Sequence, residues 1–332
     1  MGRTRPELSA VIPLFNEHDG LDELYRRVSL ACRNEGLADY EIVLVNDGST
    51  DGTREKAFDL AHSDSRVTVI DLSRNYGHQV ALTAGLEFCS GRRIFILDAD
   101  LQDPPELLGP MMRKMDEGYD VVYGVRTSRE GETWFKRASA SLFYRFLRRL
   151  SDTDIAEDAG DFRLMSRRAL DHLIEMPERF RFIRGMVSWL GFRQYPMPYD
   201  RSRRLTGVSK YPLKKMLLLA VDAVTSFSIL PLRVASLAGL VVGVFGLLLL
   251  GYTLASWMLG HVVQGWTSIA AIVLILGSVQ LFVLGVFGEY LGRMYIEVKR
   301  RPLYIVREIA RGGRSVTEQS VLERERSHVR AG

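Results

Sequence analysis

Residues 93–105 read Arg93-Ile94-Phe95-Ile96-Leu97-Asp98-Ala99-Asp100-Leu101-Gln102-Asp103-Pro104-Pro105, an apolar run that ends in a cluster of carboxylates. Similar apolar runs alternate with helix-like patterns through the N-terminal part of the chain. The runs expected to form strands are Leu8–Leu14, Tyr40–Val45, Val67–Leu72, Arg93–Leu97 and Asp120–Tyr123. Helices are expected at Leu21–Glu35, Thr53–His62, Gln79–Cys89 and Pro105–Glu117. This alternation predicts an α/β fold whose mostly parallel sheet is covered by helices on both faces.

Ligands bind such sheets outside the carboxyl ends of the strands, so the residues after each strand are candidate binding residues. They are Pro13, Phe15, Asn16 and Glu17, then Asn46 and Asp47, Arg74 and Asn75, the set Asp98, Asp100, Gln102 and Asp103, and lastly Arg126. Carboxylates that converge on one crevice repel each other unless a cation lies among them. Asp98 and Asp100 therefore predict a site for Mg²⁺ or Mn²⁺ that also holds substrate phosphates.

The turn Asn46-Asp47-Gly48-Ser49-Thr50-Asp51-Gly52 follows the second expected strand. Its polar side chains are suited to capping the next helix. Asp47 at the strand tip could in addition accept the imide N–H of a uracil. No Gly-x-Gly-x-x-Gly or Walker-type phosphate loop follows the first strand, which argues against dinucleotide-binding and P-loop enzymes.

The chain changes character after residue 233. No Asp, Glu, Lys or Arg occurs between Arg233 and Glu289, although charged residues make up 25% of the chain. The segments Val234–Leu259 and Trp266–Phe287 each approach the roughly 20 apolar residues that cross a bilayer. A helical hairpin buried in a soluble core is the alternative. The polar start Met1–Ser9 shows no cleavable signal peptide, so membrane insertion is expected to rely on the hairpin.

Basic residues flank this apolar region on both sides. They are Arg201, Arg203, Arg204, Lys210, Lys214, Lys215 and Arg233 before it, and Arg293, Lys299, Arg300 and Arg301 after it. The positive-inside tendency places both termini and the N-terminal domain in the cytoplasm. The net charge of +4 is modest, so a nucleic-acid partner is not expected. Cys32 and Cys89 have no metal-type spacing and are expected to be packing residues.

Four segments are therefore expected. They are a cytosolic domain at 1–212, an interfacial amphipathic segment at 213–232, a two-helix transmembrane hairpin at 233–288, and a cytosolic C-terminal segment and tail at 289–332. Within the last, Tyr290–Ile309 alternates basic and apolar residues and could pack back on the domain or on a neighbouring protomer.

Several ordered motifs resemble the family 2 glycosyltransferases of the polyprenyl-phosphate (bactoprenol or dolichyl phosphate) sugar synthase group. They are Val11-Ile12-Pro13-Leu14-Phe15-Asn16-Glu17, Val45-Asn46-Asp47-Gly48-Ser49, Asp98-Ala99-Asp100-Leu101-Gln102-Asp103-Pro104-Pro105, Gly160-Asp161-Phe162-Arg163-Leu164 and Arg181-Phe182-Ile183-Arg184-Gly185, followed by the double span. The resemblance covers roughly residues 8–300. One departure is Asn46, where the family usually has Asp.

The resemblance implies a GT-A fold and an inverting transfer from a sugar nucleotide. It implies that Pro13, Phe15, Glu17, Asp47, Asp98 and Ala99 contact the nucleotide sugar, that Asp100 and Gln102 hold the metal, and that Asp161 is the candidate base. The motif around Asp161 looks most like the bactoprenol glucosyltransferases that use UDP-glucose, whereas the mannose-transferring branch more often has Ser-Gly-Phe-Arg. Tetramers occur among such relatives, so self-association is expected.

A lipid phosphate acceptor and a nucleotide diphosphate are both anionic, so cations must lie along the acceptor path. The candidates are Arg126, Arg163, Arg184, Arg201, Arg204 and Lys210. A phosphate monoester is already largely anionic near neutral pH, so Asp161 is expected to act as a base or to orient the acceptor. Its alternative role is a helix or turn cap. His78, at a helix start, could approach the donor or be structural.

Other functions remain open at this point. A polyprenyl-phosphate mannose synthase would use GDP-mannose, and UDP-N-acetylhexosamine and UDP-galactose are further possible donors. A processive polysaccharide synthase would generally have more spans and a Gln-x-x-Arg-Trp motif, which the chain lacks. A non-catalytic membrane-anchoring role would be favoured by a degraded metal motif, but Asp98, Asp100 and Asp161 are all present.

Overall fold

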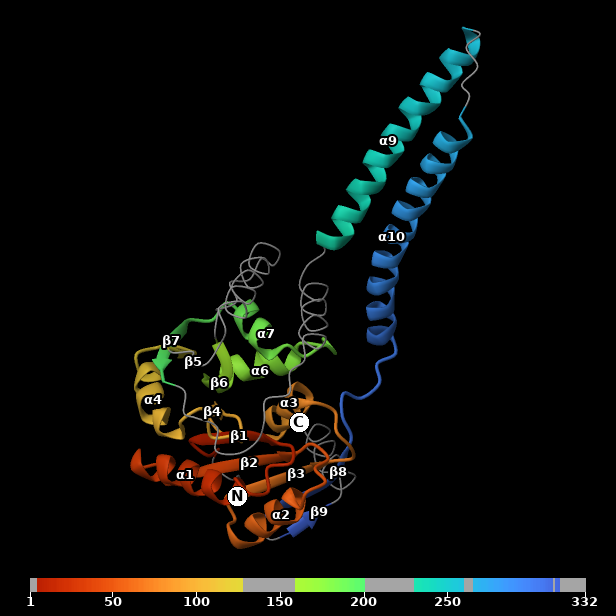
Figure 1. Ribbon diagram of the computed structural model, residues 1–332. Coiled ribbons are helices and arrows are strands. Elements are labelled where there is room, and N and C mark those ends of the chain that lie inside the picture. Colours follow the sequence, from red (N-terminus) through yellow and green to blue (C-terminus); the bar gives the residue numbers. More distant parts are fainter. Residues whose placement is uncertain (1–4, 128–158, 201–229, 260–264, 313, 317–332) are drawn as a thin grey trace, which may run out of the picture. The chain divides into compact units, whose positions relative to one another are not determined.

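The computed structural model describes residues 5–127, 159–200, 230–259, 265–312 and 314–316 (Figure 1). Two compact units emerge from the contacts within the chain. The first contains residues 1–145, 153–211 and 302–332, and the second contains residues 146–152 and 212–301. The first unit is therefore discontinuous in sequence, because the chain returns to it after residue 301.

The described part of the first unit is built on a nine-stranded sheet of order β7-β5-β6-β4-β1-β2-β3-β8-β9. Its strands are β1 (Leu8–Leu14), β2 (Tyr40–Asn46), β3 (Val67–Leu72), β4 (Arg93–Ile96), β5 (Val121–Arg126), β6 (Ala159–Ser166), β7 (Gln194–Tyr199), β8 (Val306–Arg311) and β9 (Arg314–Val316). The four central strands β4, β1, β2 and β3 are mutually parallel, with Leu14 opposite Asn46 and Val11 opposite Ile96. Their carboxyl ends therefore lie along one edge of the sheet.

The outer strands correct the prediction of a mostly parallel sheet. β6 runs antiparallel to both β4 and β5, and β8 runs antiparallel to β3. The β5–β7 pair is parallel, so only half of the strand pairs among the described residues share a direction. β6 thus places its residues between β4 and β5, where the alternation of local patterns predicted no strand.

Helices cover both faces of the sheet. Alternate β1 residues such as Leu8 and Ile12 share a core with α1 (Leu21–Asn34), α2 (Thr53–Ser63) and α4 (Leu108–Asp116), which a short 3-10 helix η1 (Pro105–Leu107) precedes. The opposite face carries α3 (His78–Phe88), followed by α6 (Arg167–Glu175) and α7 (Ile183–Trp189). α3 packs closely, because a Cβ at Gly85 would lie 2.4 Å from the Val11 side chain. The two faces follow from the two-residue alternation of strand side chains.

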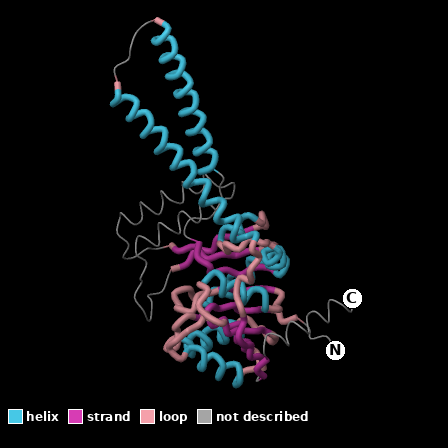
Figure 2. Tube along the Cα trace, turned by 90° about the vertical axis from the view of Figure 1, so that its right-hand side faces the viewer, coloured by secondary structure: helices cyan, strands magenta, loops and turns pink. Residues whose placement is uncertain are grey.

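The second unit consists mainly of two long helices that contact each other, α9 (Leu230–Met258) and α10 (Trp266–Val298) (Figure 2). Both are long and apolar enough to cross a membrane, at Leu232–Thr253 and Ile275–Val298. Their described side chains are largely exposed, for example Leu247 and Leu281. Within this chain the hairpin is therefore not buried in a soluble core.

The helices differ from the predicted spans in one respect. α10 continues beyond Phe287 to Val298, past Glu289 and Arg293, whose side chains form an ion pair one helical turn apart. Such i,i+4 pairs allow a helix to continue into a polar segment. The predicted interfacial segment, apart from its last residues, lies outside the described residues.

Candidate active site

The acidic run after β4 forms one side of the candidate site. The Asp98 side chain is 29% exposed, and its Oδ1 is a buried atom without a hydrogen-bond partner. Asp100 Oδ1 accepts a hydrogen bond from the backbone N–H of Gln102 at 3.1 Å, in a turn where Leu101 has a positive φ of 55°. Burial, together with repulsion from Asp161, Asp103 and Asp100, raises the pKa of Asp98 to about 6, although His78 opposes the shift. This side of the site carries more negative charge than its surroundings neutralise.

Asp103 continues the same run but points into the protein. It is fully buried, it accepts a hydrogen bond from the Tyr199 hydroxyl, and its Oδ2 has no hydrogen-bond partner. The nearest cation is Arg126, whose Nη2 lies 3.8 Å from Asp103 Oδ1. Tyr199 also accepts a hydrogen bond from Arg126 Nε at 3.3 Å, so the hydroxyl links the carboxylate to the guanidinium.

Asp161 on β6 forms the other side, and several hydrogen-bond donors and cations surround its carboxylate. It is 2% exposed, and Arg184 approaches both of its oxygens, with Nε at 3.0 Å from Oδ1 and Nη2 at 3.3 Å from Oδ2. Gln79 Nε2 donates to Oδ2 at 2.8 Å, and Arg163 Nη2 lies 3.9 Å from Oδ1. Burial alone would raise the pKa of Asp161, but Arg184, His78 and Arg163 together hold it well below its usual range. Asp161 is therefore an ionised carboxylate and a weak proton acceptor, and it lies within a strand rather than at a helix or turn cap.

His78 connects the two sides. Its Nε2 lies 3.2 Å from Asp161 Oδ2 and 3.5 Å from Asp98 Oδ1. Burial lowers the pKa of His78, but the two carboxylates outweigh it, so the pKa is raised above its ordinary value. His78 and Gln79 occupy the first turn of α3, beyond the carboxyl end of β3. Because ligands bind outside the carboxyl ends of the strands, these two residues are also candidate site residues.

Four of the candidate nucleotide-binding residues lie at the ends of β1 and β2, namely Pro13, Phe15, Glu17 and Asp47, whereas Asp98 and Ala99 follow β4. Phe15 is 48% exposed, whereas Asp47 is buried and accepts hydrogen bonds from the backbone N–H groups of Tyr76 at 2.7 Å and Gly77 at 2.9 Å. Gly48, at φ +67°, is required here because a Cβ would lie 2.6 Å from the backbone of Arg74 and Asn75. Asp47 thus holds the loop Ser73–Gly77 against the end of β2, while Pro13 lies in β1 opposite Val45.

The nucleotide side is also braced by the turn after β1. Asn16, at φ 57°, donates its backbone N–H to Ser49, and its side chain accepts from the backbone N–H of Thr50. The backbone N–H of Glu17 donates to the Thr53 hydroxyl at 2.9 Å. The two turns after β1 and β2 are therefore joined by side-chain bonds.

The structure brings together three of the six cations predicted for the acceptor. Arg184 and Arg163 contact Asp161, and Arg126 lies beside Gly160, where an added Cβ would be 3.2 Å from Arg126 Nη2. Arg163 is buried and donates to the carbonyl oxygens of Gly160 and Asp161, and burial lowers its pKa to about 10. Arg201, Arg204 and Lys210 lie outside the described residues.

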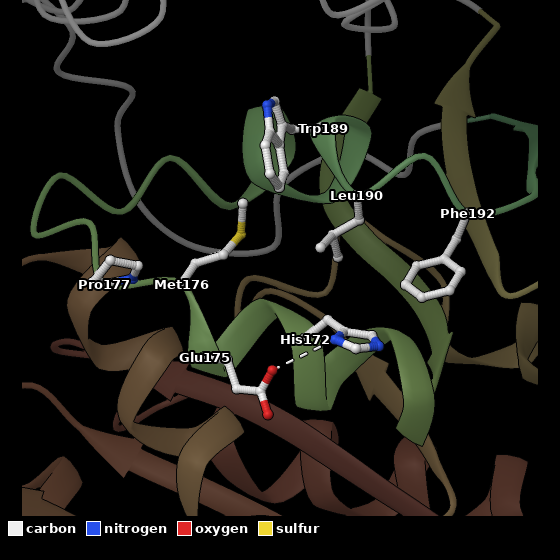
Figure 3. A pocket seen from close by; sticks show the side chains of 7 residues that line it. All are labelled: His172, Glu175, Met176, Pro177, Trp189, Leu190 and Phe192. Carbon is white, nitrogen blue, oxygen red and sulfur yellow. Dashed lines mark ion pairs between the residues drawn. The ribbon is translucent and has the colours of Figure 1, made fainter.

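A separate open hollow of about 460 Å³ lies between the end of α6 and the end of α7 (Figure 3). Its lining consists of His172, Glu175, Met176, Pro177, Trp189, Leu190 and Phe192. An ion pair joins His172 and Glu175 at 3.5 Å. None of the predicted site residues that the structure describes lines this hollow, so it is distinct from the group of residues around His78.

Residues 9–174 match the family described as Glycosyl transferase family 2, and residues 230–294 match the GtrB C-terminal hairpin. The chain belongs to glycosyl transferase family 2. An uncharacterized glycosyltransferase of Bacillus subtilis, YkcC, is 46% identical over 91% of this chain and 94% of its own length. The SfII prophage-derived bactoprenol glucosyl transferase of Shigella flexneri is 39% identical over 92% of this chain and 99% of its own.

Among solved structures, this family 2 glycosyltransferase is similar to the mannosyltransferase PcManGT from Pyrobaculum calidifontis in complex with GDP-Man and Mn²⁺. The two are 17% identical with a TM-score of 0.43, over 87% and 88% of the chains. The family match and the relatives confirm the resemblance drawn from the sequence motifs, and with it the GT-A type of α/β fold and the glycosyltransferase class. The alternative of a non-catalytic anchoring protein is wrong.

Proposed function

We propose that this enzyme transfers a hexose, preferentially glucose, from a UDP-sugar to a polyprenyl phosphate such as undecaprenyl phosphate, with inversion at the anomeric carbon. The observation that carries the proposal is that His78 lies between an acidic group after β4 and a cation-rich group around Asp161. An acidic side suits a metal-bound diphosphate, and a cation-rich side suits a second phosphate. The names of the bactoprenol glucosyl transferases among the relatives support a glucosyl group and a bactoprenol acceptor.

Asp100 and Gln102 are the proposed ligands of Mg²⁺ or Mn²⁺. Among the described residues, no three His, Cys, Asp or Glu side chains are grouped so as to hold a metal ion. Two protein ligands are nevertheless enough for Mg²⁺, which often completes its coordination with substrate phosphates and water. The Oδ1 of Asp98 nearby is buried without a hydrogen bond, and burial together with the carboxylates around Asp98 raises its pKa, which fits a place where a further cation would be favourable. A bound cation there would stabilise the negative charge of the departing diphosphate.

Pro13, Phe15, Glu17, Asp47, Asp98 and Ala99 are the proposed contacts to the nucleotide sugar. Two backbone N–H groups already bind Asp47, one at each oxygen. An ionised carboxylate has about four lone-pair positions, so each oxygen retains capacity for one further donor, such as a uracil imide. The exposed ring of Phe15 offers an apolar surface to a base.

The acceptor supplies its own nucleophile. A phosphate monoester, with a second pKa at about 6, is largely a dianion near neutral pH. Its oxygen would form a bond to the anomeric carbon while the bond to UDP breaks and UDP leaves with the electron pair. No proton must be removed, which agrees with the low pKa of Asp161. We assign Asp161 the role of orienting Arg184 toward the acceptor rather than that of a base.

Arg184 and Arg126 have side chains 32% and 25% exposed, so both can reach a phosphate at the crevice. Arg163 is buried and contributes charge to Asp161 from inside. Arg201, Arg204 and Lys210 remain proposed contacts nearer the membrane.

Chain connectivity supports a membrane placement. β8 lies in the same sheet as β3, so the chain that leaves the first unit before α9 re-enters it after α10. If the hairpin spans the membrane twice, its two ends lie on one side, and the basic flanks make that side the cytoplasm. We propose an integral protein of the inner or plasma membrane, with the segment 213–232 at the interface. Self-association as a tetramer also remains a prediction.

The proposal is tested by incubating the purified full-length enzyme with undecaprenyl phosphate and labelled UDP-glucose, UDP-N-acetylglucosamine, UDP-galactose or GDP-mannose. We expect lipid-linked product from UDP-glucose, its loss with chelator, and its restoration by Mg²⁺ or Mn²⁺. Asp100→Ala should reduce transfer by at least about a thousandfold, whereas Asp59→Ala on the exposed face of α2 should not. Preference for GDP-mannose would identify a mannose synthase, and absence of lipid-linked product from every donor would overturn the function.

A further inference from the structure

The strand that follows the hairpin, β8, supports the residues at the carboxyl end of β3, beside the candidate nucleotide-binding residues. β8 begins at Val306, only a short segment after α10 ends at Val298, and it pairs with β3 (Figure 1). Thr68 lies opposite Arg311 at one end of the pair and Leu72 opposite Val306 at the other, with a bulge between Asp71 and Leu72. The Leu72 end is the carboxyl end of β3, where the candidate site lies.

At that end the C-terminal segment binds both backbone groups of Ser73. The Ser73 N–H donates to the Ile305 carbonyl at 2.9 Å, and Arg307 Nη2 donates to the Ser73 carbonyl at 2.6 Å. Tyr304 adds a hydrogen bond to Glu87 on α3. Residues 304–307 therefore fix the position at which the chain leaves β3.

Arg307 is itself held by a buried carboxylate. Asp71 is fully buried, and Arg307 Nη1 lies 3.3 Å from its Oδ2. Asp71 also accepts from Asn46 Nδ2 at 2.7 Å and from Arg54 Nε at 2.9 Å, and Arg54 in turn pairs with Glu308 at 2.7 Å. A buried carboxylate with this many fixed donors holds Arg307 in one orientation.

Ser73 opens the loop that ends on Asp47. The Ser73 hydroxyl is 2.9 Å from the Tyr76 hydroxyl, and the N–H groups of Tyr76 and Gly77 donate to the Asp47 carboxylate. α3 begins at the next residue, with His78 and Gln79 on Asp161. A shift of Ser73 would therefore be transmitted to Asp47 over a loop of five residues, Ser73–Gly77.

We propose that Arg307 is a positioning residue for the donor site. From β8 it holds Ser73, and through the loop Ser73–Gly77 it fixes Asp47, so that nucleotide binding depends on the strand that directly follows the membrane hairpin. The inference rests on the proposed function, because Asp47 is a contact to the base only if the donor is a nucleotide sugar.

Arg311 provides a matched control on the same strand. Its side chain is 46% exposed against 51% for Arg307, and its Nη2 lies 3.3 Å from Glu41 Oε2, the same separation as in the Arg307–Asp71 pair. Arg311, however, lies opposite Thr68, at the end of β3 remote from Ser73. Loss of either arginine removes one partly exposed ion pair, but only loss of Arg307 releases the loop.

The test measures UDP binding by calorimetry, and KM and kcat for the UDP-sugar, with the full-length enzyme in nanodiscs. Arg307→Ala should weaken UDP binding and raise the donor KM about fivefold, the size expected for one lost hydrogen bond, with little change in kcat. Arg311→Ala should leave UDP affinity and the donor KM unchanged. Arg307→Lys, which keeps a charge beside Asp71 but cannot bind two acceptors as a fork, should fall between them.

Equal UDP affinity in wild type, Arg307→Ala and Arg311→Ala, with only thermal stability lowered, would overturn the inference. If Arg307→Ala does not fold, Arg307→Lys decides, and wild-type affinity in that variant would count against a positioning role. Failure of the proposed function is distinguishable, because it would show as no lipid-linked product from the wild type whatever the variants do. UDP affinity is measured without an acceptor.

Discussion

Two carboxylates that both lie within 3.5 Å of His78 have opposite environments. Asp98, after β4, has a buried oxygen without a donor, and its pKa is raised to about 6. Asp161, on β6, is bound by Arg184, Gln79 and His78, and its pKa is held well below its usual range. Asp98 has one cationic neighbour, His78 at 3.5 Å, whereas Asp161 has Arg184 and Arg163 as well as His78. Burial raises the pKa of both carboxylates, and the two guanidinium groups beside Asp161 reverse that effect.

Under the proposed function, this contrast suits two different substrates. Asp98, with only His78 as a cationic neighbour, suits the proposed donor side, where a bound cation would add positive charge. A carboxylate saturated with guanidinium groups cannot be an effective base, but it can hold those groups in place for an anionic acceptor. The predictions below test whether each side behaves as its charge balance requires.

After the loss of Asp100, the largest expected effect is on Asp161. Asp161→Asn keeps the shape but removes the charge that pairs with Arg184, so transfer should fall by at least about a hundredfold and the acceptor KM should rise. Unfolding free energy should also fall by about 2–3 kcal/mol, because a buried ion pair loses one partner. Asp116→Asn, which breaks the exposed pair with Arg93, should change neither. A kcat loss without change in stability or acceptor KM would instead make Asp161 a base.

An intermediate effect is expected for metal binding. Since the described protein ligands are few, Mn²⁺ affinity measured by electron paramagnetic resonance should tighten at least about tenfold when UDP is present. Asp100→Asn should remove the UDP-dependent increase in Mn²⁺ affinity. Tight Mn²⁺ binding without nucleotide would show that the protein completes the coordination sphere by itself.

The smallest effect is on the stability contribution of Asp98. Its folded-state pKa of about 6 lies above the unfolded value, so ionisation of Asp98 destabilises the fold as pH rises through 6. Asp98→Asn should therefore raise Tm by a few degrees, on the order of 2–4 °C, above pH 6. The gain should shrink as pH falls from about 6 toward 4, where Asp98 becomes protonated in both states. A Tm difference that does not vary with pH would mean that Asp98 is already neutralised in the folded protein.

Much of the fold could be predicted from the sequence because the central strands are short, apolar and separately bounded. β1 and β3 lie at the predicted residues, and every residue of β1 is buried. The end of the second span was placed at Phe287 because charged residues follow, yet α10 continues to Val298 with a local ion pair between Glu289 and Arg293. The first charged residues show where the apolar part of the helix ends, but they do not show where its backbone hydrogen bonding ends.

The site was predictable only at strand ends. Asp47, Asp98 and Asp100 follow strands that are recognisable from their apolar sequences. Parallel strands have their carboxyl ends at one edge of the sheet, so the position of these three residues along that edge could be predicted. The partners of Asp161 could not be predicted in this way. β6 lies antiparallel between β4 and β5, and Arg184 comes from α7. The Arg307–Asp71 pair spans 236 residues and the whole hairpin, and no periodicity in the sequence indicates it.

The late arrival of β8 has a consequence for biosynthesis. Translation proceeds from the N-terminus, so β3 leaves the ribosome long before β8 exists. Until then, the edge of β3 that β8 later pairs with has unpaired backbone groups, which is a hazard for association with other chains. The sheet can close only after α9 and α10 have been synthesised. The order of the chain therefore makes completion of the sheet wait for production of the helical hairpin.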